Sequence, residues 1–318
     1  MRKLKIGLLG CGVVGGGFVR LLEEHAPIIR AHAEADVSIS KILVRDLSKT
    51  RPGVSPSLLT TRGEDVVRNG ADIIVELIGG TSVARSLLRD SIASGKHVVT
   101  ANKRLLALCG PELLDLASVH RVRVGFEASV CGAIPIIRVV RDALAGDRIE
   151  SIEGIVNGTS NFILTRMEES GATFAEALAE AQARGFAEAD PTLDIDGSDA
   201  AEKITILAGL AFPGAPARWE RREGIAAISP VDFAAAAHEG KVVRHVGSIR
   251  WDGACAVLDA APRFLPRGHP LASVRGEGNG IVVRAHAAGE LTLFGAGAGS
   301  LPSATSVLAD VVEIARGM

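Results

Sequence analysis

The feature that most constrains the fold is a glycine-rich turn between an apolar run and a helical pattern. The turn Gly10-Cys-Gly12-Val-Val-Gly15 follows Lys3–Leu9 and leads into a helical pattern over Gly15–Ala31. In a G-x-G-x-x-G turn the first glycine makes the tight bend and the second lets the backbone approach a pyrophosphate. The third lets helix and strand pack closely, with the helix N-terminus facing the anion. This placement predicts dinucleotide binding. The residues expected at the cofactor are Gly10, Gly12, Val13, Val14 and Gly15.

Strand-like and helix-like segments alternate through the first third of the chain. The predicted strands are Lys3–Leu9, Ser38–Val44, Asp72–Ile78, His97–Thr100 and Arg123–Phe126. The predicted helices between them are Gly15–Ala31, Val83–Ser94 and Leu113–Ser118. Because parallel strands need crossover connections, this alternation indicates an α/β, Rossmann-type doubly wound parallel sheet. We expect a dinucleotide-binding domain over residues 1–132, on which the C-terminal helix of residues 300–318 packs back.

The pattern changes after Pro135, where helices come first and strands dominate later. The predicted helices are Ile134–Leu144, Asn161–Ser170, Phe174–Arg184, Ala200–Ala211 and, at the end, Ala304–Ala315. The predicted strands are Ile149–Val156, Val242–Arg250, Cys255–Phe264, Gly280–Ala285 and Glu290–Phe294. This order is typical of an α+β domain with a mostly antiparallel sheet, here residues 133–299.

Composition excludes several classes of protein. With 318 residues and a net charge of −2, the chain has no basic footprint for nucleic acid. No apolar run approaches the ~18 residues of a membrane span. Four scattered cysteines favour a reducing compartment, and we expect a cytoplasmic protein. The start of the chain resembles the basic and apolar regions of a signal peptide, but it is rich in glycine and has no A-x-A-like cleavage site.

The residues after the second predicted strand bear on the choice between NAD and NADP. An acidic residue there binds the ribose 2′-hydroxyl, whereas an arginine accommodates a 2′-phosphate. Arg45, Lys49 and Arg51 cluster there and favour NADP. The alternative is that they form a solvated loop, with Asp46 as the ribose ligand and NAD as the cofactor.

Lys103 follows the strand that ends at Thr100. Ligands of such sheets bind beyond the carboxyl ends of the strands, so Lys103 is expected to point into the cofactor crevice. The alternative is an ordinary surface charge.

The densest group of charged residues runs from Glu188 to Lys203. Its acidic members are Glu188, Asp190, Asp194, Asp196, Asp199 and Glu202. Asp199 and Lys203 are four residues apart on a predicted helix and therefore share a face. Part of the group has a structural interpretation, because Asp196 or Ser198 can cap the helix and Asp199 with Glu202 fits a capping box. An EF-hand spacing is missing. The remaining acids suit a substrate ammonium group, with Lys203 able to transfer a proton.

These stretches together resemble the homoserine dehydrogenase family from the first strand to the last helix. The matching segments are GCGVVG (10–15), VELIGG (75–80), TANKRLLA (100–107), FEASVCGAIPII (126–137), GIVNGTSNFILTRM (154–167), AQARGFAEADPTLDIDGSDAAEK (181–203) and GAGAGSLPSATSVLAD (295–310). The resemblance implies NAD(P)-dependent interconversion of L-homoserine and L-aspartate 4-semialdehyde in threonine, methionine and isoleucine biosynthesis. It also implies a homodimer built through the sheet of residues 133–299, which would be the substrate-binding and dimerisation domain.

The resemblance assigns roles to particular residues. Lys203 is implied as the proton donor and acceptor, with Asp199 and Lys103 completing the catalytic group. The implied substrate-binding residues are Glu188, Asp194, Asp199 and Lys103. Besides the glycine turn, the implied cofactor-binding residues are Arg45, Gly80, Thr81, Asn102, Lys103 and Gly297. A monovalent-cation site, usually for sodium, is implied at Glu127 and the carbonyl groups of Val130, Gly132 and Ile134.

Some residues depart from the family pattern, and two other functions compete with it. Phe186 stands where the family usually has tyrosine, and Ser160 replaces the commoner threonine. The chain stops after the last predicted helix, so we expect neither a C-terminal regulatory domain nor a fused aspartate kinase. One alternative is a silent dinucleotide-binding sensor, which would not need Lys203. The other is an aspartate-semialdehyde-type dehydrogenase, which would need Cys131 as a nucleophile.

Overall fold

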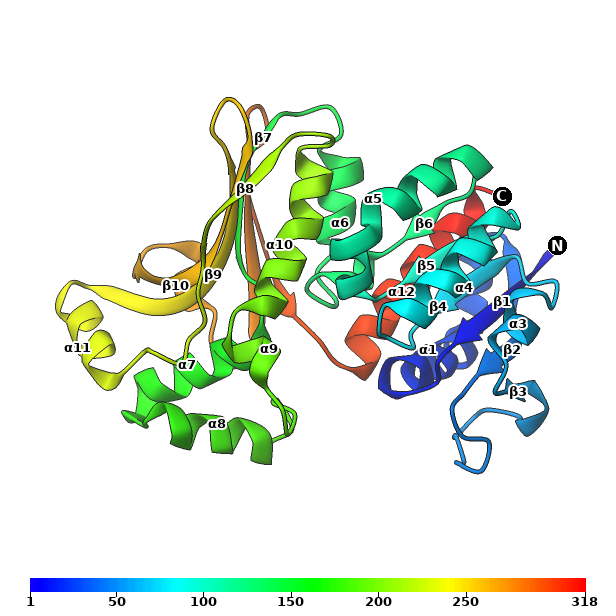
Figure 1. Ribbon diagram of the computed structural model, residues 1–318, viewed down its shortest axis with the longest axis horizontal. Coiled ribbons are helices and arrows are strands. Elements are labelled where there is room, and N and C mark those ends of the chain that lie inside the picture. Colours follow the sequence, from blue (N-terminus) through cyan, green and yellow to red (C-terminus); the bar gives the residue numbers. More distant parts are fainter. The chain divides into compact units, whose positions relative to one another are not determined.

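The computed structural model describes all residues, 1–318, in two compact units (Figure 1). Unit 1 comprises Met1–Ala133 together with Ala298–Met318, and unit 2 comprises Ile134–Gly297. Each unit contains one six-stranded sheet. No helix is both long enough and apolar enough to cross a membrane.

Unit 1 is built on a parallel sheet whose strand order is β3-β2-β1-β4-β5-β6. The strands are β1 (Arg2–Leu9), β2 (Ala35–Leu43), β3 (Leu59–Thr60), β4 (Ile73–Glu76), β5 (His97–Thr100) and β6 (Val124–Gly125). The helices are α1 (Val13–Glu24), α2 (Ala26–Ala33), α3 (Gly63–Val67), α4 (Ser82–Ala93), α5 (Lys103–His120) and α12 (Ser300–Arg316). The order reverses at β1, and in such sheets dinucleotides bind at this switch point, beyond the carboxyl ends of the strands.

Apolar helices cover the strands of unit 1 on both sides. One cluster joins Ile6 and Leu8 of β1 to Phe18 of α1 and to Val307 and Val311 of α12. Another joins neighbouring strand residues to the helices α3, α4 and α5. Burial on both sides explains why these strands are continuous apolar runs in the sequence.

The return of α12 to unit 1 depends on a close helix contact (Figure 1). A Cβ at Gly17 of α1 would lie only 2.6 Å from Ser300 Oγ, at the start of α12. Ser300 Oγ also donates a hydrogen bond to the Val13 carbonyl (2.7 Å). Glycine is therefore required where the two helices meet.

Two helix predictions in unit 1 are wrong in their limits. The predicted helix Gly15–Ala31 is two helices, α1 and α2, because the chain breaks at His25 and α2 begins at Ala26, with Pro27 in its first turn. The predicted helix Leu113–Ser118 is the end of α5, an 18-residue helix that contains Pro111. Buried residues before and after Pro111, including Leu105 and Leu113, hold α5 against the sheet despite the lost backbone N–H.

Unit 2 contains a mixed, mostly antiparallel sheet with the order β12-β11-β7-β9-β10-β8. The strands are β7 (Ile149–Ile155), β8 (Ala217–Arg222), β9 (Lys241–Trp251), β10 (Ala256–Pro266), β11 (Gly278–Ala285) and β12 (Gly289–Ala296). The helices are α6 (Ile136–Arg138), α7 (Gly158–Ser170), α8 (Phe174–Ala183), α9 (Thr192–Ile195), α10 (Ser198–Ala211) and α11 (Pro230–His238). Only β8 and β10 pair in parallel. The predicted fold class is confirmed in both units.

The central strand of unit 2, β9, is covered on both sides. Ile204 of α10 packs so closely on Gly247 that a Cβ there would lie 2.6 Å from it. On the other side Val242 and Val246 belong to an apolar cluster with Leu271 and Val274. These contacts place α10, with its polar N-terminal turn, directly against the sheet.

Candidate functional site

The glycine turn of unit 1 presents bare backbone between β1 and α1. Gly10 has a φ of +100°, and a Cβ there would lie 2.7 Å from the Leu77 carbonyl oxygen. A Cβ at Gly15 would lie 2.3 Å from the Gly10 carbonyl oxygen. No atom lies within 4 Å of the place where Gly12 would carry a Cβ, and no side chain caps α1. The first backbone N–H groups of α1 are therefore left for an anion, which fits the pyrophosphate of a dinucleotide.

Glu76 lies at the carboxyl end of β4 and is fully buried. Its Oε1 accepts hydrogen bonds from the backbone N–H groups of Ile78 (2.9 Å) and Gly79 (3.0 Å), and its Oε2 accepts one from Thr100 Oγ1 (2.5 Å). Burial raises the pKa of this carboxyl, although the hydrogen bonds oppose the shift. Glu76 thereby ties the turn after β4 to the end of β5. Glu76 belongs to the VELIGG segment (75–80), but its sequence context predicted no role for it.

Asn102 joins the same two loops. Its Nδ2 donates to the Gly80 carbonyl (2.6 Å), and its Oδ1 accepts from the Leu105 N–H (3.1 Å), which caps α5. Lys103, half-buried, is the first residue of α5, and Thr81 is the residue before α4. The structure thus brings four predicted residues to the carboxyl edge of the sheet, namely Gly80, Thr81, Asn102 and Lys103. Gly297 belongs to unit 2, where the Asn279 amide occupies the place of a Cβ.

The charged loop after β2 divides into two kinds of residue. Asp46 Oδ1 accepts hydrogen bonds from the Ser48 hydroxyl (2.7 Å) and the Ser48 N–H (2.8 Å), and these bonds lower the pKa of Asp46. Arg51 donates to the carbonyl groups of Lys49 (2.7 Å) and Asp46 (3.0 Å). Arg45, by contrast, is exposed and makes no hydrogen bond or ion pair. Asp46 and Arg51 therefore shape the loop, while Arg45 keeps its guanidinium available.

In unit 2, Lys203 and Asp199 form a buried ion pair on α10. Lys203 Nζ donates to Asp199 Oδ2 (2.7 Å) and to the Val156 carbonyl (2.6 Å). Lys203 is 9% exposed and Asp199 6%. The prediction that both lie on one helix face is confirmed. A lysine held in this way can exchange a proton at a fixed position.

The predicted Ser198 cap and the predicted capping box of α10 are wrong, because Ser198 and Asp199 lie inside the helix. The residue before the helix is Gly197, with a φ of +83°, and no side chain caps the helix. Asp196 instead accepts a hydrogen bond from the Ser198 N–H (2.7 Å), and the Ser198 hydroxyl accepts one from Arg222 (2.7 Å). A Cβ at Gly197 would lie 2.9 Å from the Glu223 carbonyl oxygen, so glycine is required here.

Asn157, which sequence reasoning missed, connects the ion pair to a second carboxylate. Its Nδ2 donates to Asp194 Oδ1 (2.7 Å) and to Asp199 Oδ2 (2.8 Å). Ser160 Oγ donates to the Asp194 carbonyl (2.6 Å). The result is a continuous chain of hydrogen bonds from Lys203 through Asp199 and Asn157 to Asp194. An Asn-Gly pair between a strand and a helix is a capping signal, but it does not reveal partners 37 and 42 residues away.

The rest of the acidic segment is more exposed. Glu188 is exposed, and it is not a member of the series of hydrogen bonds that runs from Lys203 to Asp194. Asp190 accepts from the Thr192 hydroxyl (2.5 Å), which closes a local turn. Phe186, the departure from the family pattern, packs its ring 4.8 Å from that of Phe162. At this position the side chain therefore makes an aromatic contact with Phe162 and has no hydroxyl group.

The predicted cation ligands lie in the segment that follows β6. Glu127 is 2% exposed, and its backbone N–H donates to Asp310 Oδ2 (2.8 Å). The Gly132 carbonyl accepts from Ser306 Oγ (2.7 Å). Cys131 and Gly132 have left-handed φ angles of +54° and +51°. One carboxylate with backbone carbonyl groups is a hard oxygen donor set, which fits an alkali or alkaline-earth cation. Cys131 is buried, which disfavours its use as a nucleophile.

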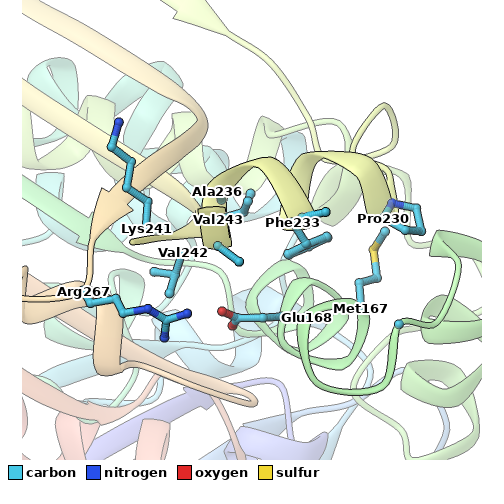
Figure 2. A pocket seen from close by; sticks show the side chains of 12 residues that line it. Met167, Glu168, Pro230, Phe233, Ala236, Lys241, Val242, Val243 and Arg267 are labelled. Atoms are coloured by element: carbon cyan, nitrogen blue, oxygen red, sulfur yellow. The ribbon is translucent and has the colours of Figure 1, made fainter. Parts of the chain in front are cut away.

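A separate cavity of about 330 Å³ lies between α7, α11 and β9 (Figure 2). Met167 and Phe233 form part of its apolar wall, and Glu168 and Arg267 extend toward one another across it. Glu168 pairs with Arg244 (2.9 Å). None of the predicted site residues lines this cavity.

The fold and the glycine turn define a Rossmann-type, dinucleotide-binding oxidoreductase with a lysine–aspartate pair in its second unit. The family described as homoserine dehydrogenase matches residues 135–312, and the homoserine dehydrogenase NAD-binding domain matches residues 10–127. The chain belongs to the homoserine dehydrogenase family, and it is an NAD(P)-dependent oxidoreductase of amino-acid biosynthesis.

Relatives match over nearly the whole chain. Homoserine dehydrogenase of Neisseria gonorrhoeae is 44% identical over 99% of this chain and 73% of its own length. That of Bacillus subtilis is 41% identical over 100% of this chain and 74% of its own. The structure of a homoserine dehydrogenase from Thiobacillus denitrificans superposes with a TM-score of 0.95 at 43% identity, over 99% of this chain and 74% of that one. The structure of a hyperthermophilic archaeal homoserine dehydrogenase in complex with NADPH superposes with a TM-score of 0.85 at 27% identity. The match covers 99% of this chain and 98% of that one.

Proposed function

We propose that this chain interconverts L-homoserine and L-aspartate 4-semialdehyde, with Lys203 as the proton donor and acceptor. The observation that carries the proposal is the buried Lys203–Asp199 pair, because it fixes a proton-transfer group in a segment that matches the family. When bound, the nicotinamide cofactor supplies or accepts the hydride. In the reduction Lys203 gives its proton to the oxygen of the aldehyde, and in the oxidation it takes the proton from the hydroxyl group.

The substrate is held through its charged groups. Asp194, Asp199 and the exposed Glu188 provide negative charge for the substrate ammonium, which supports their role as substrate ligands. Lys103, at the start of α5, is proposed to contact both cofactor and substrate. These contacts orient the substrate so that hydride and proton transfer occur at one carbon and its oxygen.

The cofactor is proposed to be NADP in preference to NAD. The exposed Arg45 supports this choice, because Asp46 is already bonded to Ser48 and a free guanidinium matches phosphate geometry. The other proposed cofactor-binding residues are Gly10, Gly12, Val13, Val14, Gly15, Gly80, Thr81, Asn102, Lys103 and Gly297.

Three further features complete the proposal. Residues 1–132 with 300–318 act as the dinucleotide-binding domain, and residues 133–299 bind substrate and form a homodimer. Glu127 and the carbonyl groups of Val130, Gly132 and Ile134 hold a sodium ion. The chain works in the cytoplasm, where its nicotinamide cofactor is available.

One assay tests this function directly. NADPH oxidation is followed by absorbance with aspartate semialdehyde, and the assay is repeated with NADH. Substrate-dependent oxidation, faster with NADPH, is the expected result. Cofactor binding without turnover would identify a silent sensor instead. A requirement for inorganic phosphate, with an acyl phosphate as product, would identify an aspartate-semialdehyde-type dehydrogenase.

A further inference from the structure

Asn157 holds a position in unit 2 that serves two purposes at once. Its Oδ1 accepts the Ser160 N–H (2.7 Å) and caps α7, so Nδ2 must face the other way. There each of its two N–H bonds meets a different carboxylate, at Asp194 and Asp199. The side chain is 6% exposed, so these bonds are shielded from water. The cap alone does not require the two donors.

We infer that Asn157 is a positioning residue that holds the Asp199 carboxylate on Lys203. This inference rests on the proposed role of Lys203. Two neighbouring carboxylates repel one another, and an amide between them gives each a donor without adding charge. A cation in that place would compete with Lys203 for Asp199. A neutral bridge leaves the ion pair intact and fixes the direction of the shared oxygen.

The segment around Asn157 holds every member of the chain of hydrogen bonds. The Val156 carbonyl accepts from Lys203, and Ser160 donates to the backbone of Asp194. The junction of β7 and α7 therefore sets the places of the lysine and both carboxylates. Because proton transfer depends steeply on distance, a shift of about 1 Å at this junction lowers turnover by about 100-fold.

The first test separates positioning from capping. Asn157→Ser retains a capping oxygen, since serine and asparagine cap helices about equally well, but its hydroxyl is too short to bridge both carboxylates. We expect kcat to fall about 10- to 100-fold, with the KM for NADPH changed less than about two-fold. Asn157→Asp keeps the size and the cap but removes both donors, and it should lose at least as much kcat.

Thr173→Ala is the matched control, because Thr173 caps α8 in the same unit and is exposed. This control should lower the thermal unfolding temperature and leave kcat unchanged. The inference would be overturned if Asn157→Ser kept the wild-type kcat. It would also be overturned if kcat fell only in proportion to the fraction of the variant that is folded.

A double-mutant cycle identifies the group through which Asn157 acts. In a Lys203→Ala background, assayed at high enzyme concentration, Asn157→Ser should change kcat less than about two-fold, because no lysine remains to be positioned. An equal loss in both backgrounds would overturn the inference and leave the proposed function intact. If Lys203→Ala alone retained wild-type turnover, the role of Lys203 would fail and the inference with it.

Discussion

Glu76 in unit 1 and Asp199 in unit 2 are both buried carboxylates, but they are stabilised by different groups. Glu76 is held by two backbone N–H groups and the Thr100 hydroxyl, and these are neutral donors. Asp199 is held by the Lys203 ammonium and the Asn157 amide. Neutral donors fix the shape of two loops, whereas an ammonium partner makes the carboxylate part of a proton-transfer group.

This difference extends to the rest of each unit. In unit 1 the glycine turn and the Gly80 carbonyl offer mainly backbone groups to a ligand or a neighbouring loop. In unit 2 side chains with full charges are gathered at the N-terminal end of α10. Apart from Lys103, which is also proposed to contact substrate, changes in unit 1 should therefore affect cofactor binding and stability, and changes in unit 2 should affect turnover.

Removing Lys203 is the strongest test of this difference between the two units. Lys203→Ala should lower kcat by about 10²- to 10⁴-fold, the usual contribution of a general acid–base group. NADPH binding should change little, because the proposed cofactor-binding residues other than Gly297 lie in unit 1. Steady-state kinetics and a binding titration measure the two effects. Near-wild-type turnover would remove Lys203 from the mechanism.

Neutralising Asp194 tests whether charge or only shape matters in unit 2. Asp194→Asn keeps the size of the side chain but loses a charge-assisted contact worth about 1.5–3 kcal/mol. The kcat/KM for the amino substrate should fall by about 10- to 100-fold. If kcat/KM is unchanged and only the unfolding temperature falls, the carboxylate is structural.

A change at Arg45 tests whether unit 1 determines the choice of cofactor. Arg45→Ala should weaken NADPH binding by about 1.5–3 kcal/mol, because the bonds to the 2′-phosphate are charge-assisted. NADH has no such phosphate and should bind as before. Fluorescence titration of both cofactors against both proteins decides the matter. Equal losses for the two would show that Arg45 does not contact the 2′-phosphate.

The smallest effect is expected at Glu76 and concerns pH. Burial raises its pKa above the ordinary 4.5. Folding therefore favours the protonated form, and its stabilising contribution is complete below the unfolded pKa and is lost as the pH rises through the folded pKa. Glu76→Gln cannot ionise, so its unfolding temperature should improve relative to the wild type as the pH rises from 4 to 7, by a few degrees. Calorimetry on both proteins measures this, and parallel curves would contradict it.

The sequence predicted the features that have a local pattern. The glycine turn, the alternation of strands and helices, and the i,i+4 spacing of Asp199 and Lys203 all depend on residues close together in the chain. The break at His25 is followed by Pro27, which was visible in the sequence, yet the apolar spacing continued through both and favoured one helix. The edge strand Ala217–Arg222 was missed because it is exposed throughout and shows no apolar alternation.

The parts of the site that could not be predicted depend on contacts distant in the sequence. Asn157 is visible as a helix cap, but its bonds to Asp194 and Asp199 require the folded chain to bring the start of α7 close to the start of α10. Glu76 interrupts an apolar strand, and only the pairing of β4 with β5 shows why a carboxylate is tolerated there. The signal in the sequence is a polar side chain within an apolar run for Glu76, and only an ordinary helix cap for Asn157.

The packing of α12 into unit 1 has a consequence for the order in which the protein is made. A ribosome releases β1 to β6 first, then the whole of unit 2, and only afterwards the residues of α12. Val307 and Val311 cover Ile6, Leu8 and other residues that were synthesised some 300 positions earlier. Domains usually fold as they emerge, with the N-terminal one first. Here α1 and α2 cover only part of that side of the nascent sheet while unit 2 is translated. The rest depends on the later helix, or on a chaperone in the interval, to bury its apolar residues.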